Sequence, residues 1–331
     1  MKTRILVTGG AGFIGSHTCK RLAAEGFEPI VYDNLSTGNR EAVKWGPLVD
    51  ADIADTAKLA ATMRRFKVAA VVHFAASAYV GESVTDPAKY YRNNVTGTLS
   101  VLEACRQAGV DRLVFSSSCA TYGVPQELPI RETTPQAPIN PYGRSKLIGE
   151  WMIDDFAAAH GLDAVCLRYF NACGADPDGE IGEWHEPETH LIPRALMAAF
   201  GASETLDVFG TDYPTEDGTC VRDYIHVADL ARAHVLAVRH LLDGGKGLKV
   251  NLGTGTGLSI RQITTAITRV TGREVPIVER DRRAGDPPHL VADPSLARQL
   301  LSFEAEHSDI DTIVDTAAPF FAERYRDEAA A

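Results

Sequence analysis

Tyr142 and Lys146 are the residues of this sequence whose types and spacing most clearly suggest catalysis. Asn140 and Pro141 precede them as a helix N-cap and a first helical residue, so the two side chains should share one helix face. A phenol with an ordinary pKa of about 10 is a poor base at neutral pH. We expect the fixed ammonium to stabilise the phenolate, lower that pKa and make Tyr142 a general base.

A run of three serines, Ser116, Ser117 and Ser118, ends the apolar segment 112–116, which predicts a strand. A hydroxyl at the end of that strand can reach the substrate oxygen that Tyr142 reaches. A tyrosine and a lysine four positions apart are common on surface helices, so the pair alone proves little. The serines and the capped helix favour the catalytic interpretation.

The residues that position this pair begin with a glycine loop at Gly9, Gly12 and Gly15. The loop follows a predicted strand at 5–7 and opens a predicted helix at 13–25. Glycines at this spacing allow a tight turn and a close approach of the backbone to a pyrophosphate, while the helix N-terminus offers free amides. The pattern therefore predicts a dinucleotide-binding loop.

Asp33 ends the next predicted strand, where an acid hydrogen-bonds the adenine ribose. It would repel the 2′-phosphate of NADP, because two like charges about 4 Å apart near a surface cost about 4 kcal/mol. Asn34 follows, not the Arg that NADP would favour, so we expect NAD, whose positive nicotinamide would also stabilise the Tyr142 phenolate. Asp52 is either a contact to the adenine amine or the N-cap of a helix at 56–66.

Alternating strand and helix patterns in the first half predict an α/β fold with a doubly wound parallel sheet, the Rossmann arrangement. From about residue 171 the pattern loosens into long Gly- and Pro-rich stretches. We expect an NAD-binding Rossmann domain at 1–172 and a smaller α/β substrate domain at 173–331, some of whose segments return to the first.

The composition narrows the possible partners. The 331 residues carry a formal net charge of -11, which disfavours nucleic acid and anionic membranes. Six dispersed cysteines and an N-terminus without a signal-like segment suggest free thiols in a cytoplasmic protein.

Longer motifs give a family resemblance. The glycine loop, the serine strand and the Tyr–Lys pair resemble the extended short-chain dehydrogenases/reductases. The segments 73–76, 80–83, 90–95, 167–171 and above all 209–227 closely resemble the UDP-glucose 4-epimerase family. That family catalyses reversible, NAD-dependent C4 epimerisation of UDP-glucose and UDP-galactose through a 4-keto intermediate.

The resemblance implies roles for individual residues. Tyr142 would be the acid and base at sugar O4, Lys146 would hold the nicotinamide ribose, and Ser118 would hydrogen-bond O4. The residues implied for NAD binding, besides Tyr142 and Lys146, are Gly9, Gly12, Phe13, Ile14, Gly15, Asp33, Asn34, Asp52, Ile53, Phe74, Ala75, Asn93, Ser116 and Tyr169. Those implied for the UDP-sugar, besides Ser118 and Tyr142, are Asn171, His190, Leu191, Phe209, Arg222, Arg283, Asp286 and Leu290. The resemblance also implies a homodimer packed through helices near 91–108 and 142–160.

Three positions depart from the family pattern. Ala78 stands where a lysine often contacts the cofactor, which suggests weaker NAD retention. His190 replaces an asparagine but can still donate a hydrogen bond. Leu290 replaces a larger gating residue, often tyrosine, so UDP-N-acetylhexosamines are expected to be partly accepted.

Two other functions use a similar fold and cofactor. A sugar-nucleotide 4,6-dehydratase needs acids after the serine strand, where this chain has Cys119, Ala120 and Thr121. A non-catalytic NAD-binding regulator would have no need of the Tyr–Lys pair.

Two further motifs suggest sites that we do not expect. The glycine repeat at 253–257 precedes a predicted helix at 260–271 with Ser259 as its N-cap. The repeat lacks a lysine and a following acidic strand, so we expect a structural turn. The loop that holds Glu183, His185, Glu186, Glu188 and His190 lacks helical spacing, so we expect no metal there.

Overall fold

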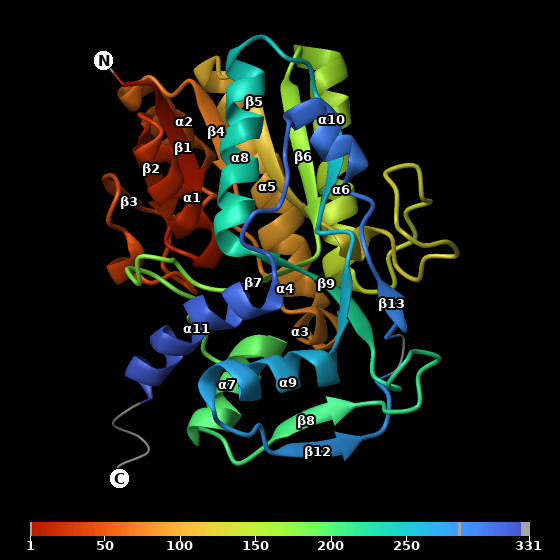
Figure 1. Cartoon of the computed structure of the whole chain (residues 1–331). Helices are drawn as coiled ribbons and strands as arrows, with labels where there is room; N and C mark the ends of the chain where they lie inside the picture. The colour runs from red at the N-terminus through yellow and green to blue at the C-terminus, as the bar shows by residue number, and fades with distance from the viewer. Residues whose placement is uncertain (1, 284–285, 326–331) are drawn as a thin grey trace.

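The computed structural model describes residues 2–283 and 286–325. A seven-stranded parallel sheet lies between two layers of helices, and a smaller unit covers one end of it (Figure 1). The sheet order is β10 (Leu248–Leu252), β6 (Asp163–Tyr169), β5 (Arg112–Ser118), β4 (Ala70–His73), β1 (Arg4–Thr8), β2 (Glu28–Asp33) and β3 (Leu48–Asp50). This doubly wound sheet confirms the predicted fold class.

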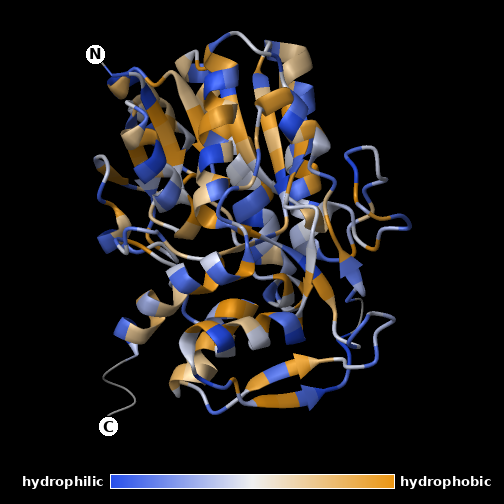
Figure 2. Ribbon diagram, in the orientation of Figure 1, coloured by the Kyte–Doolittle hydropathy of each residue, from blue (hydrophilic) through white to orange (hydrophobic). Residues whose placement is uncertain are grey.

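Both faces of the sheet are buried, which explains the continuous apolar runs of its strands (Figure 2). In β1, Ile5 and Val7 belong to the core on one face and Leu6 to the core on the other. The first core is covered by α1 (Phe13–Ala24), α8 (Val227–Leu242) and α10 (Ser295–Leu301). The second is covered by α2 (Thr56–Phe66), α5 (Gly97–Ala108) and α6 (Pro141–His160).

The smaller unit has its own apolar core among α7 (Leu191–Phe200), α9 (Ile260–Thr271) and α11 (Ile310–Arg324) (Figure 1). Beside these helices, β8 (Leu206–Phe209) pairs with β12 (Ile277–Arg280). A small sheet centred on β9 (Val221–His226) joins β7 (Asn171–Cys173), β11 (Gly257–Ser259) and β13 (His289–Leu290).

The connection from β4 to α5 begins with an irregular segment at 74–79 and is mostly helical from residue 80 onward. It contains α3 (Val80–Thr85), α4 (Pro87–Tyr90) and a π-helical segment, η2 (Tyr91–Thr96), that runs directly into α5. The predicted helix at 91–108 is therefore real, but its first turns are wider than an α-helix. The 3₁₀ turns η1 (Arg40–Ala42) and η3 (Cys119–Thr121) complete the elements.

The predicted caps are confirmed. Asn140 accepts a hydrogen bond from the Gly143 amide at 2.8 Å and begins α6, and Ser259 caps α9. Strand β5 runs two residues further than predicted and so contains all three serines.

Segments from the second half of the chain complete the first sheet. Strand β10 pairs with β6, and α8 packs along α1 over the same face (Figure 1). Within the described part of the chain, none of the helices has the length and apolar content needed to cross a bilayer.

Candidate active site

The glycine loop joins β1 to α1 in a turn that only small residues allow. Gly9 has a φ of +71°, and a Cβ there would lie 2.6 Å from the Ala75 amide nitrogen. A Cβ on Gly15 would lie 2.1 Å from the Gly9 carbonyl oxygen. The loop thus brings the N-terminus of α1, with Phe13 and Ile14 as its first residues, against the segment that follows β4.

Asp33 lies at the end of β2 with its carboxylate held by the backbone. Its oxygens accept hydrogen bonds from the amides of Ala11 at 3.0 Å and Leu35 at 2.9 Å. These bonds favour the ionised form, but burial outweighs them and raises the pKa of Asp33. The carboxylate is therefore oriented beside the glycine loop, where the sequence predicted it.

Asp52 and Asn34 lie together next to Asp33. Asn34 donates from Nδ2 to Asp52 at 2.8 Å, and Asp52 accepts the Ala54 amide at 2.8 Å. The N-cap of α2 is Asp55, whose carboxylate accepts the Lys58 amide. The N-cap alternative for Asp52 is therefore wrong, which leaves its exposed carboxylate beside the loop.

Four other residues assigned to the cofactor line the same edge of the sheet or support it. The amides of Phe74 and Ala75 donate to the Thr8 carbonyl at 3.0 and 3.2 Å. Asn93 donates to the Ser77 hydroxyl at 3.2 Å. Ile53 is buried, and its side chain lies where a Cβ on Gly97 would clash.

Asn94, its neighbour in η2, was missed by the sequence analysis. It is buried and bonds the Ser77 amide and carbonyl and the Ser145 hydroxyl at 2.8–2.9 Å. It therefore ties the segment after β4 to helix α6. Its only sequence signal was a second asparagine beside Asn93.

The catalytic candidates meet at the end of β5 and the start of α6. Tyr142 is hydrogen-bonded to Ser118. Lys146 donates from Nζ to the Ser116 carbonyl at 2.7 Å, and this ammonium lies 5.9 Å from the centre of the Tyr142 ring. The Ser116 and Tyr169 hydroxyls are 2.5 Å apart. The structure thus brings together the five residues that the sequence placed there.

The expected lowering of the tyrosine pKa is not provided by the polypeptide. Burial raises the pKa of Tyr142 to about 12, although its hydrogen bond with Ser118 acts in the opposite direction. Burial lowers the pKa of Lys146 to about 8, against the favourable field of Glu150. Lys146 donates to a backbone carbonyl and burial disfavours both charges, so the chain alone does not lower this pKa, and the lowering that was expected also depends on the positive nicotinamide ring.

A buried polar network beneath these residues was also missed. Arg168 in β6 pairs with Glu150 in α6 at 2.5 Å, and the Ser117 hydroxyl donates to the same carboxylate. Arg168 also donates to the Tyr122 hydroxyl at 2.9 Å. The network fixes α6 against β5 and β6, and the signal for it was an arginine inside a buried strand.

The smaller unit presents most of the residues assigned to the UDP-sugar. Arg222, nearly buried in β9, forms an ion pair with Asp286. The Arg283 guanidinium stacks 3.8 Å from the centre of the Phe209 ring at the end of β8. The side chains of Arg222 and Asp286, expected to contact different parts of the ligand, contact each other.

The remaining four lie where the two parts of the chain meet. Asn171 begins β7 directly after β6. Leu191 is the first residue of α7, with His190 as its N-cap. Leu290 packs on the cluster that contains Tyr122 and Phe170 and that Cys119, next to Ser118, also contacts.

The glycine repeat at 253–257 is a structural turn. The Asp223 carboxylate accepts the amides of Thr254, Gly255 and Ala292 at 2.8–3.1 Å. These amides are engaged within the protein, as predicted for a turn.

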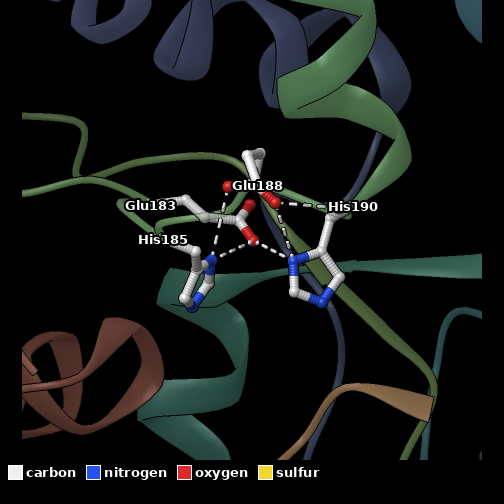
Figure 3. A group of neighbouring side chains, drawn as sticks. All are labelled: Glu183, His185, Glu188 and His190. Carbon is white, nitrogen blue, oxygen red and sulfur yellow. Dashed lines mark hydrogen bonds and ion pairs between the residues drawn. The ribbon is translucent and has the colours of Figure 1, made fainter. Parts of the chain in front are cut away.

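The loop before α7 gathers four of the five side chains whose spacing in the sequence is not helical. Glu183, His185, Glu188 and His190 converge (Figure 3), whereas Glu186 turns to Trp184 and Arg324. The paired glutamates raise the pKa of His185 to about 9 and that of His190 to about 10 despite burial, which acts in the opposite direction. The lack of helical spacing did not predict this arrangement, because a folded loop can bring side chains together as a helix does.

Comparison with known proteins agrees with this geometry. Residues 5–253 match the model of the NAD dependent epimerase/dehydratase family. A UDP-glucose 4-epimerase of Rhizobium meliloti is 56% identical over 95% of each chain. The crystal structure of UDP-glucose 4-epimerase from Brucella ovis in complex with NAD superposes with a TM-score of 0.95 at 64% identity, over 96% of this chain and 98% of that one.

A third relative has a wider substrate range in its name. The UDP-Glc/GlcNAc 4-epimerase of Campylobacter jejuni superposes with a TM-score of 0.85 at 40% identity, over 97% of this chain and 99% of that one. The chain belongs to the NAD dependent epimerase/dehydratase family, and within it the UDP-glucose 4-epimerases are the proteins it resembles.

Proposed function

We propose that this chain binds NAD and catalyses the reversible inversion of C4 in UDP-glucose and UDP-galactose. The observation that carries the proposal is the meeting of Tyr142, Ser118 and Lys146 at the same edge of the sheet as the glycine loop and Asp33. The sequence identity to UDP-glucose 4-epimerases over nearly the whole chain supports it.

Each catalytic side chain has one task in this reaction. Bound NAD supplies reversible hydride acceptance at sugar C4. Tyr142 removes the O4 proton and later returns it, Ser118 donates a hydrogen bond to O4, and Lys146 holds the ribose of the cofactor. Because both faces of the sugar ring must be presented, tight binding has to come from the UDP part.

We assign binding of the UDP part of the substrate to the smaller unit and to the segments leading into it. Arg222 and Arg283 would neutralise the diphosphate, and Asp286 would accept from a ribose hydroxyl once Arg222 turns to the phosphate. Phe209, Leu191, Asn171 and His190 would line the rest. The stack of Arg283 on Phe209 supports this, because it holds a guanidinium in a fixed plane.

The cofactor site is assigned to the first half of the chain. The amides at Gly12, Phe13 and Ile14 would meet the pyrophosphate, and Asp33 and Asn34 the adenine ribose. Asp52 and Ile53 would contact the adenine. The exposed position of Ala78 in place of a lysine supports a looser hold on NAD.

Two other functions are less well supported. A dehydratase would need an acid after Ser118, but the 3₁₀ turn there consists of Cys119, Ala120 and Thr121. A regulator would not require a lysine kept buried beside Tyr142.

Incubation of the purified protein with UDP-galactose, followed by coupled detection of UDP-glucose, tests the proposal. Tyr142→Phe should reduce turnover by about 10²–10⁴-fold, because it removes proton transfer, with the circular dichroism spectrum unchanged. Turnover near that of the unmodified chain would disprove the role of Tyr142, and an inactive unmodified chain would disprove the function. Incubation with UDP-N-acetylglucosamine, followed by chromatographic detection of UDP-N-acetylgalactosamine, tests whether Leu290 leaves room for an N-acetyl group.

We further propose a homodimer packed through α5 and α6. These helices contact each other, and each exposes a large apolar side chain: Leu99 is 41% and Trp151 56% exposed. Light scattering should give twice the chain mass, and Trp151→Glu should give the single mass. Leu300→Glu, which alters a similarly exposed residue on α10, should leave the dimer intact. The same measured mass for the unmodified chain and for Trp151→Glu would contradict this interface.

The cytoplasm is the proposed location. All six cysteines are free, and burial raises the pKa of Cys105 and Cys119 to about 12. Unpaired thiols are typical of a reducing compartment.

A further inference from the structure

Four side chains of the loop before α7 form a compact group, which we call the His–Glu cluster: Glu183, His185, Glu188 and His190 (Figure 3). One ligand atom from each lies within 4.8 Å of the others. The glutamate side chains are almost fully buried, at 3% and 4% exposure, and His185 is 18% exposed. Imidazole and carboxylate are the ligand types that zinc accepts.

Several distances within the cluster are close to the edges of a small coordination polyhedron. Nδ1 of His185 lies 3.4 Å from Oε1 of Glu183 and 3.3 Å from Oε2 of Glu188. Nδ1 of His190 lies 2.8 Å from Oε1 of Glu183 and 3.2 Å from Oε1 of Glu188. A tetrahedral ion with bonds of about 2.0–2.1 Å separates its ligand atoms by about 3.3–3.4 Å. Because the two histidines face different oxygens of Glu188, an ion would be bound after a small turn of that carboxylate and a slight opening of the contact between His190 and Glu183.

A buried oxygen of Glu183 lies between the two histidines. Oε1 of Glu183 is 2.8 Å from Nδ1 of His190 and 3.4 Å from Nδ1 of His185, and both Nδ1 atoms are also within hydrogen-bond geometry of Glu188. One proton on each ring nitrogen can serve only one carboxylate oxygen well, whereas a cation among the four side chains would engage all of them.

We propose that the His–Glu cluster is a binding site for a divalent transition-metal ion, with zinc as the ion that its geometry suits. Two carboxylates and two imidazoles that have each released a proton balance the charge of such an ion. Four protein ligands close the coordination sphere, which is typical of a structural site and not of a catalytic one. The proposal goes beyond the epimerase reaction, although His190 is shared with the residues assigned to the UDP-sugar.

A neighbouring acidic group is neutralised by a side chain of the protein and does not require a metal ion. Asp176, Asp178 and Glu180 also lie close together, but the Lys20 ammonium pairs with all three at 2.6–2.7 Å. An amine already occupies the position that a cation would take, and carboxylates alone do not favour zinc. This acidic group is therefore a matched control.

The place of the cluster suggests what a bound ion does. The His185 ring lies 6.3 Å from that of Phe13 on α1 and 6.0 Å from that of Tyr79. Asn39 donates to the Trp184 carbonyl of the same loop at 3.3 Å. An ion would stiffen the loop against the start of α1, while the Nε2 atoms lie on the far side of both rings (Figure 3).

The test uses the full chain, stripped with a chelator and then dialysed against zinc chloride or, separately, magnesium chloride. Metal content is measured by mass spectrometry, and cobalt(II) chloride serves as a spectroscopic probe. We expect one zinc per chain, no retained magnesium, and the strong visible bands of tetrahedral cobalt. His185→Gln and Glu183→Gln should each weaken zinc binding by at least about 100-fold, because each removes a ligand.

The acidic control variant, Asp178→Asn, should retain zinc like the unmodified chain. The proposal is overturned if the unmodified chain retains no zinc, if cobalt gives only the weak bands of an octahedral ion, or if Asp178→Asn and not His185→Gln loses the metal. Because the cobalt spectrum is taken on the unmodified chain, the test stands even where a variant fails to fold. Metal content is read without substrate, so this result and that of the epimerase assay are separate.

Discussion

At the scale of single residues, the fold disfavours the charged forms of Tyr142 and Lys146, the two main active-site candidates. Burial raises the pKa of Tyr142 and lowers that of Lys146, so the resting chain holds a neutral phenol beside a weakly held ammonium. Such opposed shifts are common where a protein keeps groups for chemistry at the expense of stability.

Replacing Lys146 by methionine should therefore stabilise the nucleotide-free protein. The lowering of its pKa from 10.5 to about 8 corresponds to about 3 kcal/mol against folding. Loss of the hydrogen bond to Ser116 offsets about 1 kcal/mol of this. Lys146→Met should then raise the free energy of unfolding in urea at neutral pH by about 2 kcal/mol while it abolishes turnover.

The pH dependence gives this prediction a sign. The free energy of unfolding of Lys146→Met should exceed that of the unmodified chain by its full amount below pH about 8. This difference should shrink as the pH rises towards 10.5, because the folded unmodified chain then releases a proton that its unfolded state keeps. Lys58→Met, at an exposed lysine of α2, should change stability by less than about 0.5 kcal/mol at any pH. A destabilised Lys146→Met would show that the ammonium contributes more than burial removes.

At the scale of elements, helix α6 positions the catalytic pair through its first two turns. Asn140 caps the helix, Tyr142 and Lys146 follow within the first six residues, and Glu150 anchors the next turn to β6 through Arg168. The buried network makes the middle of α6 rigid. The Asn140 cap holds the N-terminal end of α6, which carries Tyr142 and Lys146.

Asn140→Ala should lower the free energy of unfolding by about 1 kcal/mol, because the Gly143 amide loses its acceptor. It should also reduce turnover several-fold, since the first turn of α6 carries Tyr142. Asp309→Ala removes the equivalent cap of α11 and should cost similar stability without a change in turnover. Equal turnover losses in both variants would mean that the effect is one of general stability.

At the scale of the whole molecule, the two parts of the chain are interleaved. Residues 1–172 supply six strands of the main sheet, but β10 and the covering helices α8 and α10 come from the second half. Residues such as Leu230, Ala233 and Val238 of α8 are fully buried against that sheet.

A chain cut to residues 1–172 should therefore not fold as a unit. It would expose the face of the sheet that α8 covers, which favours dye binding and aggregation. We expect strong binding of a hydrophobic dye and no cooperative thermal transition by circular dichroism. A cooperative transition together with one NAD bound per fragment would show that the N-terminal part is an autonomous domain.

Local patterns allowed much of this protein to be predicted. Strand periodicity, the caps Asn140 and Ser259 and the conformational demand of Gly9 all act within a few residues. They therefore appear in the sequence as spacing and residue type. The parallel sheet was predicted from the repeated alternation of strand and helix patterns.

The remaining features depend on contacts between distant segments. Asn94 meets Ser145, Glu150 meets Arg168, and Arg222 meets Asp286 across many residues of intervening chain. No local period marks such pairs. The pKa values of Tyr142 and Lys146 in the chain without NAD depend on burial in the same way, because burial is a property of the assembled core.

The sequence by itself determined that Tyr142 and Lys146 share one face of a capped helix and that the glycine loop precedes a helix. Helical periodicity and backbone sterics suffice for both. Only the tertiary structure decided that Lys146 donates to Ser116 and that the His–Glu cluster converges. Desolvation and loop closure depend on which segments pack together, and that packing is set by the whole chain.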